Sequence, residues 1–201
     1  MKRALLIPLI LMGCSLFGGR NDPEVSSRGA VCGDPSIKGE VIGEVDGGHR
    51  SCGVPRAVRV TSVGGVSLSQ ASVMECSTAR VLDVWVEDEM DSVLGAMGGG
   101  VDQLQVASHY ACRTRNSQTG ARVSEHAKGK AIDIAAFQFR DGSELSVKEH
   151  WGEGRNGRLL KRLHQSACGP FGTVLGPESD RHHQDHFHFD TAEHRGGAYC
   201  R

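Results

Sequence analysis

Cysteine usage constrains the fold of this chain more than any other feature. Seven cysteines occur in 201 residues, and an odd number leaves one cysteine outside any set of intramolecular pairs. Only 38% of the residues are hydrophobic, and a chain with a lean core gains much from covalent cross-links. The cysteine count therefore predicts a disulfide-stabilised domain and one further cysteine with a different task.

The first fourteen residues account for the odd cysteine. Lys2 and Arg3 precede an apolar run at residues 4–12, which is too short to cross a bilayer as a helix. This order is typical of a secretory signal peptide. Residues 11–14, LMGC, resemble a bacterial lipobox, in which the cysteine is acylated and becomes the mature N-terminus. We predict a signal peptide at residues 1–13 and lipid on Cys14; an ordinary signal peptide with an incidental cysteine is the alternative.

The lipid anchor would place the protein in the bacterial cell envelope, on a membrane facing the periplasm, with the outer membrane favoured. Residues 14–30 are rich in Gly, Ser and Asp and predict a flexible tether, followed by one folded domain at residues 31–201. Loss of Lys2 and Arg3 with the leader shifts the formal charge from −1 to −3. Such a small charge gives no reason to expect a nucleic-acid partner.

Six cysteines remain for the mature domain, and an oxidising compartment favours their pairing. Six cysteines allow 15 pairings. Pairing neighbours in the sequence predicts the disulfides Cys32–Cys52, Cys76–Cys112 and Cys168–Cys200. A cysteine metal site is the alternative, but the chain has no Cys-x-x-Cys pair.

Alternating and helical patterns predict an α+β fold with a small, mainly antiparallel sheet and flanking helices. The strongest helical pattern covers residues 67–97 and ends at three glycines. A second, shorter helix is predicted at residues 155–167. Strands are predicted at residues 40–45, 57–63, 102–110, 131–139, 144–147, 172–175 and 185–190.

Histidines are the second unusual feature of the sequence. Ten occur in the chain, and five of them lie within residues 182–194. If residues 185–190 form a strand, His186, His188 and Asp190 share one face, and the intervening phenylalanines anchor the other face in the core. Both histidines would then point into a cleft.

A second segment brings an aspartate and another histidine. Asp133 lies between two isoleucines on the predicted strand at residues 131–139 and should project away from the core. His126 precedes it on a loop that contains Gly129. A loop histidine, a strand aspartate and a strand histidine make three ligands with one open position, which is the ligand count of a catalytic zinc site.

These segments resemble known motifs. Residues 124–134, SEHAKGKAIDI, look like the S-x-H-x-x-G-x-A-x-D motif of the lysostaphin / D-Ala-D-Ala carboxypeptidase / sonic hedgehog superfamily of zinc peptidases, and DHFH resembles its terminal His-x-His. More closely, the chain resembles the extensin-like C-terminal domain family of bacterial envelope proteins over about residues 31–201. The matching words are Cys112-Arg113, SEHAKGKAIDI, FGTVLGP, DHFHFD and Tyr199-Cys200. The superfamily resemblance implies a zinc-peptidase core.

The resemblance also implies roles for individual residues. His126, Asp133 and His188 match the three ligands of Zn²⁺. His186 matches a position that assists catalysis, and it would take a proton from the attacking water. Asp185 is the rival base, because some branches of the superfamily place a carboxylate three residues before the last ligand; strand alternation points Asp185 away from the metal unless a bulge intervenes.

Arginine and further histidines would complete the site. Related peptidases use an upstream arginine to hold a substrate carbonyl or carboxylate, and Arg113 has that position, with Arg115 and Arg122 as nearby competitors. His183 or His182 would steady the oxyanion, unless both belong to a solvated loop.

Two residues beside the ligands would support them. Ser124 would hydrogen bond to a ligand or to the substrate, and Asp190 would orient a ligand histidine. Other catalytic classes lack their signals here: the chain contains no G-x-S-x-G elbow and no H-E-x-x-H motif.

The resemblance implies zinc-dependent hydrolysis of an amide bond in peptidoglycan, with stem peptides or cross-links as the partner. Endopeptidase activity is favoured over carboxypeptidase activity, because a tethered enzyme would act on a polymer. Two alternatives keep the metal fold without catalysis: a peptidoglycan-binding module and a structural zinc protein of the envelope.

Overall fold

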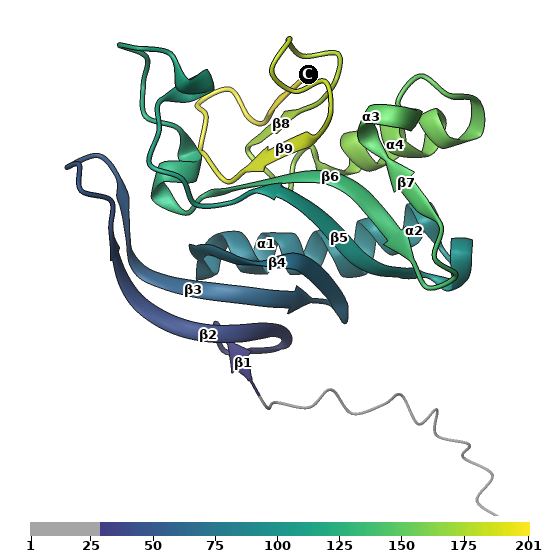
Figure 1. Cartoon of the computed structure of the whole chain (residues 1–201), viewed down its shortest axis with the longest axis horizontal. Helices are drawn as coiled ribbons and strands as arrows, with labels where there is room; N and C mark the ends of the chain where they lie inside the picture. The colour runs from purple at the N-terminus through teal and green to yellow at the C-terminus, as the bar shows by residue number, and fades with distance from the viewer. Residues whose placement is uncertain (1–28) are drawn as a thin grey trace, which may run out of the picture.

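The computed structural model describes residues 29–201, which form one ten-stranded sheet flanked by helices (Figure 1). The strand order is β1-β2-β3-β4-β5-β6-β9-β8-β10, and β7 pairs with β6. The strands are β1 (Ala30–Val31), β2 (Asp34–Asp46), β3 (Gly53–Val63), β4 (Val66–Glu75), β5 (Val101–Ser108), β6 (Ala131–Phe139), β7 (Glu144–Ser146), β8 (Thr173–Leu175), β9 (Phe187–Asp190) and β10 (Tyr199–Cys200). Only β4–β5 and β8–β10 pair in parallel. The mixed, mainly antiparallel class is as predicted, but the sheet is large rather than small.

The helices are α1 (Cys76–Val84), the π-helical turn η1 (Trp85–Met90), α2 (Asp91–Leu94), α3 (Val147–His150) and α4 (Gly154–Ala167), with short 3₁₀ turns η2 (Met97–Gly99), η3 (Arg115–Ser117) and η4 (Glu125–Lys128). The segment from α1 to α2 packs on one face of the sheet, where the ring of Trp85 lies 5.1 Å from that of Phe189. Trp85 Nε1 also donates to Ser166 Oγ of α4 at 3.0 Å. Within the described residues, no helix has the length and apolar character needed to cross a membrane.

The predicted helix at residues 67–97 is wrong in its first third, which forms β4. Gly64 and Gly65 both have positive φ, 53° and 77°, and they form the two-residue turn of an antiparallel β3–β4 hairpin. The apolar helical pattern begins only at Val73, so pairing with β3 decides the conformation of the residues before it. The other predicted strands and the second helix are present, although β2 is about twice as long as predicted and β9 begins only at Phe187. The short elements β1, α3 and β10 were not predicted.

The domain begins slightly earlier than predicted. Of the predicted leader and tether, only Gly29 and Ala30 lie within the described residues, and Ala30 already pairs with Lys38. Cys14 and its predicted lipid lie outside the described residues.

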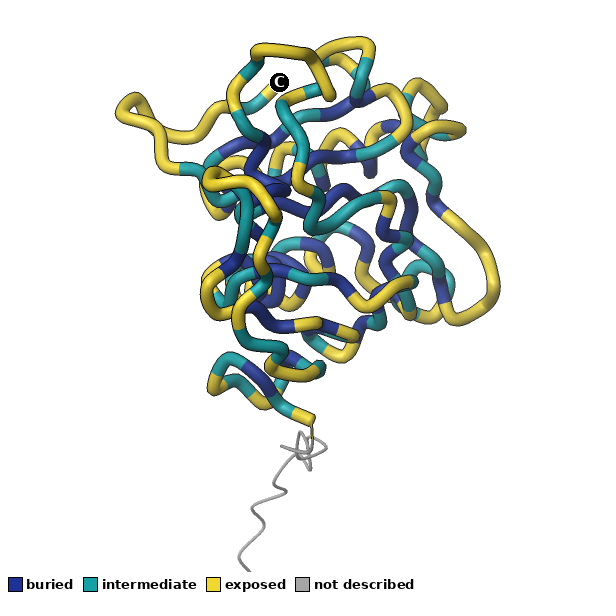
Figure 2. Tube along the Cα trace, turned by 60° about the vertical axis from the view of Figure 1, so that its left-hand side comes forward, coloured by how far each residue is buried: buried dark blue, intermediate teal, exposed yellow. Residues whose placement is uncertain are grey.

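The register between β6 and β9 separates a polar face from an apolar face. Asp133 lies opposite His188, and Ile132 lies opposite Phe189. Because side chains alternate along strands, both apolar residues face the helical layer that contains Trp85, while both polar residues face the other way. Both faces are nevertheless buried along β6, and Figure 2 shows such buried stretches in the middle of the domain, with exposed loops around them.

The three disulfides are Cys32–Cys76, Cys52–Cys112 and Cys168–Cys200. The predicted Cys168–Cys200 bond is confirmed, and the predicted bonds Cys32–Cys52 and Cys76–Cys112 are wrong. Cys32 precedes β2 and Cys52 follows it, so the 13 residues of β2 lie between them and would span roughly 40 Å if straight. A rule based on sequence neighbours fails for cysteines at opposite ends of a long strand.

The disulfide pattern gives a first prediction. Non-reducing peptide mapping by mass spectrometry should find Cys32 linked to Cys76 and Cys52 linked to Cys112. The double variant Cys52→Ser/Cys112→Ser should lower the free energy of unfolding by about 2–4 kcal/mol in denaturant titrations, because the bond closes a long loop in the unfolded chain. Recovery of a Cys32–Cys52 peptide would contradict the pairing.

Candidate metal centre

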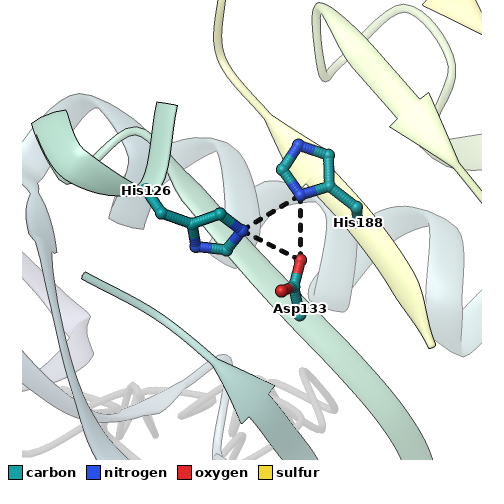
Figure 3. A group of neighbouring side chains, drawn as sticks. All are labelled: His126, Asp133 and His188. Atoms are coloured by element: carbon teal, nitrogen blue, oxygen red, sulfur yellow. Dashed lines mark hydrogen bonds and ion pairs between the residues drawn. The ribbon is translucent and has the colours of Figure 1, made fainter. Parts of the chain in front are cut away.

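Three elements bring the candidate ligands together (Figure 3). His126 lies in η4, Asp133 in β6 and His188 in β9. Gly129 ends η4 with φ 67°, and a Cβ at this position would lie 2.7 Å from a methyl group of Val54. Glycine is therefore required where the His126 turn packs against β3 and enters β6.

The three side chains converge on one point. His126 Nε2 lies 3.1 Å from Asp133 Oδ1 and 3.1 Å from His188 Nδ1, and His188 Nδ1 lies 2.9 Å from Asp133 Oδ1. All three residues are buried. One ligand atom of each could bind the same metal ion.

Hydrogen bonds on the far side of each imidazole fix which nitrogen carries a proton. His126 Nδ1 is 2.7 Å from the carbonyl oxygen of His109, which can only accept, so this nitrogen donates. His188 Nε2 donates to Asp190 Oδ2 at 3.0 Å. In the neutral form of both histidines, the lone pairs of His126 Nε2 and His188 Nδ1 therefore point toward Asp133 and toward each other.

In this neutral form the three groups place acceptors together in a buried site, where either protons on the imidazoles or a bound cation balances them. Burial alone lowers the pKa of His188, but the hydrogen bonds and charges of Asp133 and Asp190 outweigh burial and raise the pKa to about 9. Burial raises the pKa of Asp133, but hydrogen bonds from His126 and His188 hold it well below its usual range. The donor set, two oriented imidazoles and a carboxylate, fits a zinc-like divalent metal ion.

The two candidate bases occupy different environments. His186 precedes β9, and its Nε2 lies 3.8 Å from Asp133 Oδ2. Asp185 Oδ1 accepts a hydrogen bond from His186 Nδ1 at 2.8 Å, and its side chain is 65% exposed against 16% for His186. The structure thus brings His186 to the ligand group and leaves Asp185 in contact with His186.

Arg113 also reaches the ligand group. Its Nη2 lies 3.9 Å from Asp133 Oδ2, and the preceding Cys112 is bonded to Cys52. The disulfide therefore fixes the segment that carries Arg113 to the tip of the β2–β3 hairpin. The competing Arg115 pairs with Glu125 rather than with Asp133, and its Nη2 lies 3.8 Å from Glu125 Oε1.

His183 is buried beside the same group. Its ring centroid lies 5.3 Å from that of His186 and 5.7 Å from that of His188. His183 Nδ1 lies 2.8 Å from Asp180 Oδ1. Burial lowers the pKa of His183, although the hydrogen bond and charge of Asp180 act in the opposite direction. His182 is half-buried and does not line the pocket, so of these two histidines only His183 lies in the site.

Residues 38–201 match the family model described as extensin-like protein C-terminus. The chain belongs to this family. Comparison with curated proteins and comparison with solved structures found no match. The matched range contains all three candidate ligands of this extensin-like domain, as well as the Cys52–Cys112 and Cys168–Cys200 disulfides.

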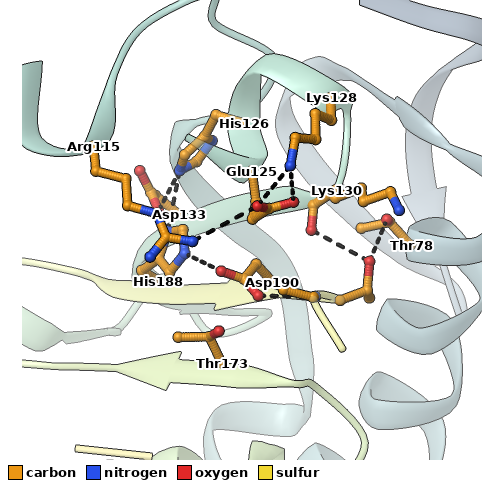
Figure 4. A network of polar contacts seen from close by, with 12 residues as sticks. Thr78, Arg115, Glu125, His126, Lys128, Lys130, Asp133, Thr173, His188 and Asp190 are labelled. Carbon is orange, nitrogen blue, oxygen red and sulfur yellow. Dashed lines mark hydrogen bonds and ion pairs between the residues drawn. The ribbon is translucent and has the colours of Figure 1, made fainter. Parts of the chain in front are cut away.

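The extensin-like domain has a cavity of about 150 Å³ at this site. Its lining includes residues that sequence reasoning did not select: Glu125, Thr173, Asp180, His194 and Tyr199. Glu125 is buried and binds Lys128 Nζ at 2.9 Å, as Figure 4 shows. Glu125 lies within SEHAKGKAIDI, Thr173 within FGTVLGP and His194 among the five clustered histidines, but no pattern assigned a role to any of these side chains.

The ligand geometry predicts stoichiometric metal binding. We expect one divalent ion per chain after dialysis against Zn²⁺ and a loss of binding in His126→Ala, Asp133→Asn and His188→Ala. The affinity for the ion should fall by more than the roughly 10–100-fold that follows removal of a residue that only hydrogen bonds to a ligand. Elemental analysis and competition with a chromophoric chelator would measure it.

His49→Ala is a matched control, because His49 is exposed in the turn between β2 and β3. This variant should bind one ion and melt at the wild-type temperature with and without metal. An Asp133→Asn protein that still binds one equivalent at wild-type affinity would contradict the assigned ligands.

Proposed function

We propose that this chain is a zinc-dependent hydrolase that cleaves an amide bond in the peptide part of peptidoglycan. One observation carries the proposal: two oriented imidazoles and a carboxylate meet within 3.1 Å at a pocket. Three protein ligands, His126, Asp133 and His188, would hold the ion and leave a position open, as in catalytic zinc sites. A bound Zn²⁺ supplies Lewis acidity, which polarises a substrate carbonyl and makes water a nucleophile at neutral pH.

His186 is the proposed general base. Its Nδ1–H donates to Asp185, so its Nε2 has a free lone pair on the side of the ligand group, 3.8 Å from Asp133 Oδ2. A base in this position takes a proton from the attacking water and later returns it to the leaving amine. Asp185 orients the imidazole through this hydrogen bond.

Arg113 and His183 are the proposed partners of the negative charge that develops on the substrate oxygen. Arg113 is always charged, lies beside Asp133 and lines the pocket. His183 lines the same pocket, and its Nδ1–H donates to Asp180. Its Nε2 donates to the oxyanion in the doubly protonated form, which the charge of Asp180 favours. Donors held in advance in a partly enclosed site stabilise a tetrahedral oxyanion more than mobile donors do.

Peptidoglycan is proposed as the substrate because of the resemblance to the superfamily of zinc peptidases and because of the predicted leader. A lipid on Cys14 would hold the domain at a membrane facing the periplasm, with the outer membrane favoured. An enzyme tethered in this way acts on cross-links or stem peptides of a polymer, which favours endopeptidase over carboxypeptidase activity.

Purified sacculi provide the test of this proposal. Wild-type protein loaded with zinc should release defined muropeptides, identified by mass spectrometry, and a chelator should stop the release. His186→Ala should lower the rate by about 10²–10⁴-fold, the usual contribution of a general base, and should keep its metal. Its metal content separates loss of the base from loss of the site.

The outcomes distinguish the enzyme from its alternatives. A wild-type protein that binds zinc and sacculi without releasing any product would support the peptidoglycan-binding module. A wild-type protein that binds zinc but neither binds sacculi nor releases product would support a structural zinc protein of the envelope. His49→Ala should cleave like the wild type, because His49 lies outside the pocket.

The anchor has its own test in a bacterial host. Cys14→Ser should move the protein from the membrane fraction to the soluble periplasmic fraction, because the acyl chains provide the membrane affinity. Metabolic labelling with a fatty acid should mark the wild type and not the variant. Unchanged fractionation of Cys14→Ser would overturn the lipoprotein proposal without affecting the metal site.

A further inference from the structure

The segment FGTVLGP, residues 171–177, carries part of the family resemblance but contributes no candidate ligand. It contains β8, which lies between β9 and β10 in the sheet. Gly172 N donates to the Asp190 carbonyl at 2.8 Å, and the Gly172 carbonyl accepts from Tyr199 N at 2.8 Å. A Cβ on Gly172 would lie 1.7 Å from the carbonyl oxygen of Ala192. This segment therefore joins the end of β9 tightly to the C-terminal segment.

Thr173 is the side chain of this segment that faces the metal ligands. It is the cross-strand partner of Asp190 in the antiparallel β8–β9 pair, so both side chains lie on one face. Thr173 is buried, and its Oγ1 lies 2.9 Å from His194 Nε2. Figure 4 places Thr173 directly below Asp190 and His188. As the cross-strand partner on the same face, the Thr173 hydroxyl lies beside the Asp190 carboxylate.

The direction of these hydrogen bonds follows from the available protons. The Asp190 carboxylate accepts from His188 Nε2 at one oxygen and from Ala192 N at the other. The carboxylate has no proton to give, so the Thr173 hydroxyl beside it contributes its single proton if the two groups interact. His194 Nε2 must then donate to Thr173 Oγ1. The chain of donors runs from His194 through Thr173 to Asp190, which also receives the proton of His188.

We propose that Thr173 and His194 are positioning residues of the metal centre. They hold the Asp190 carboxylate where it receives the N–H of His188, and this contact keeps His188 Nδ1 directed at Asp133. The inference rests on the proposed metal site. It adds that the affinity for the metal depends on His194, which reaches Asp190 only through Thr173.

The C-terminal segment thereby becomes part of the scaffold of the metal centre. His194 is exposed, and no regular element contains it. Its position is set by the residues that follow, because β10 pairs with β8 and Cys200 is bonded to Cys168. Arg201 N also donates to the Val174 carbonyl at 2.9 Å. These contacts explain why an exposed loop can hold a histidine in a fixed direction.

Zinc affinity is the readout, measured on the full mature chain by competition with a chromophoric chelator. Thr173→Val removes the hydroxyl at nearly constant volume and should weaken zinc binding about 10-fold or more, the usual effect of an outer hydrogen-bond partner. Thr173→Ser keeps the hydroxyl and should stay within about twofold of the wild type. The visible absorption of bound Co²⁺ should change in Thr173→Val and not in Thr173→Ser, because it reports ligand geometry directly.

A double-mutant cycle tests whether the two residues form one chain. His194→Ala should weaken binding less than Thr173→Val, and Thr173→Val/His194→Ala should be no weaker than Thr173→Val alone. Additive losses would overturn the chain, and His49→Ala gives the baseline for removing an exposed histidine. If Thr173→Val fails to fold, the exposed variant His194→Ala can still be compared with the wild type, and equal zinc affinity would overturn the role of His194.

The failure of this inference differs from the failure of the proposed metal site. If the wild type binds zinc, and Thr173→Val and His194→Ala bind it equally well, only the positioning role is overturned. If the wild type does not bind zinc, both proposals are overturned. Thermal unfolding of the metal-free proteins shows whether a loss of affinity merely follows a loss of stability.

Discussion

The antiparallel register between β6 and β9 is the constraint on which the rest of the site depends. It sets Asp133 opposite His188 and places Ile132 and Phe189 against the helical layer. A shift of β9 by one residue would turn its phenylalanines toward the pocket and His188 toward the apolar core. The apolar contacts of Trp85 and the phenylalanines therefore hold the ligand geometry, although they touch none of the polar atoms.

The walls of the pocket depend on covalent bonds rather than on regular structure. Cys52–Cys112 ties the segment before Arg113 to the β2–β3 hairpin, and Cys168–Cys200 ties down the segment that contains His194. Ordering a loop costs conformational entropy, and a loop with few backbone hydrogen bonds has little to offset that cost. A disulfide reduces the freedom of the unfolded chain and offsets part of that cost. This explains why a domain with a modest core can hold polar side chains at fixed distances.

Prediction from sequence succeeded where the signal is local. The strand at residues 131–139 was predicted with the bounds that β6 has, because isoleucines and an aspartate alternate there. It failed at residues 66–75, where the partner strand β3 and two glycines in left-handed conformations decide the structure. Two of the three predicted disulfides failed for the same reason, since Cys32 and Cys76 meet only after three strands have folded back on one another.

The sequence by itself determined which reactive side chains the folded domain contains: six cysteines, and two motifs that contain His126, Asp133, His186 and His188. Residue type and alternation are local properties, so they can be read along the chain. The tertiary structure alone decided which imidazole nitrogens face inward, which cysteines pair, and that Thr173 lies between Asp190 and His194. Those contacts join residues from distant segments, and their geometry follows from strand register and chain reversal, which no local pattern specifies.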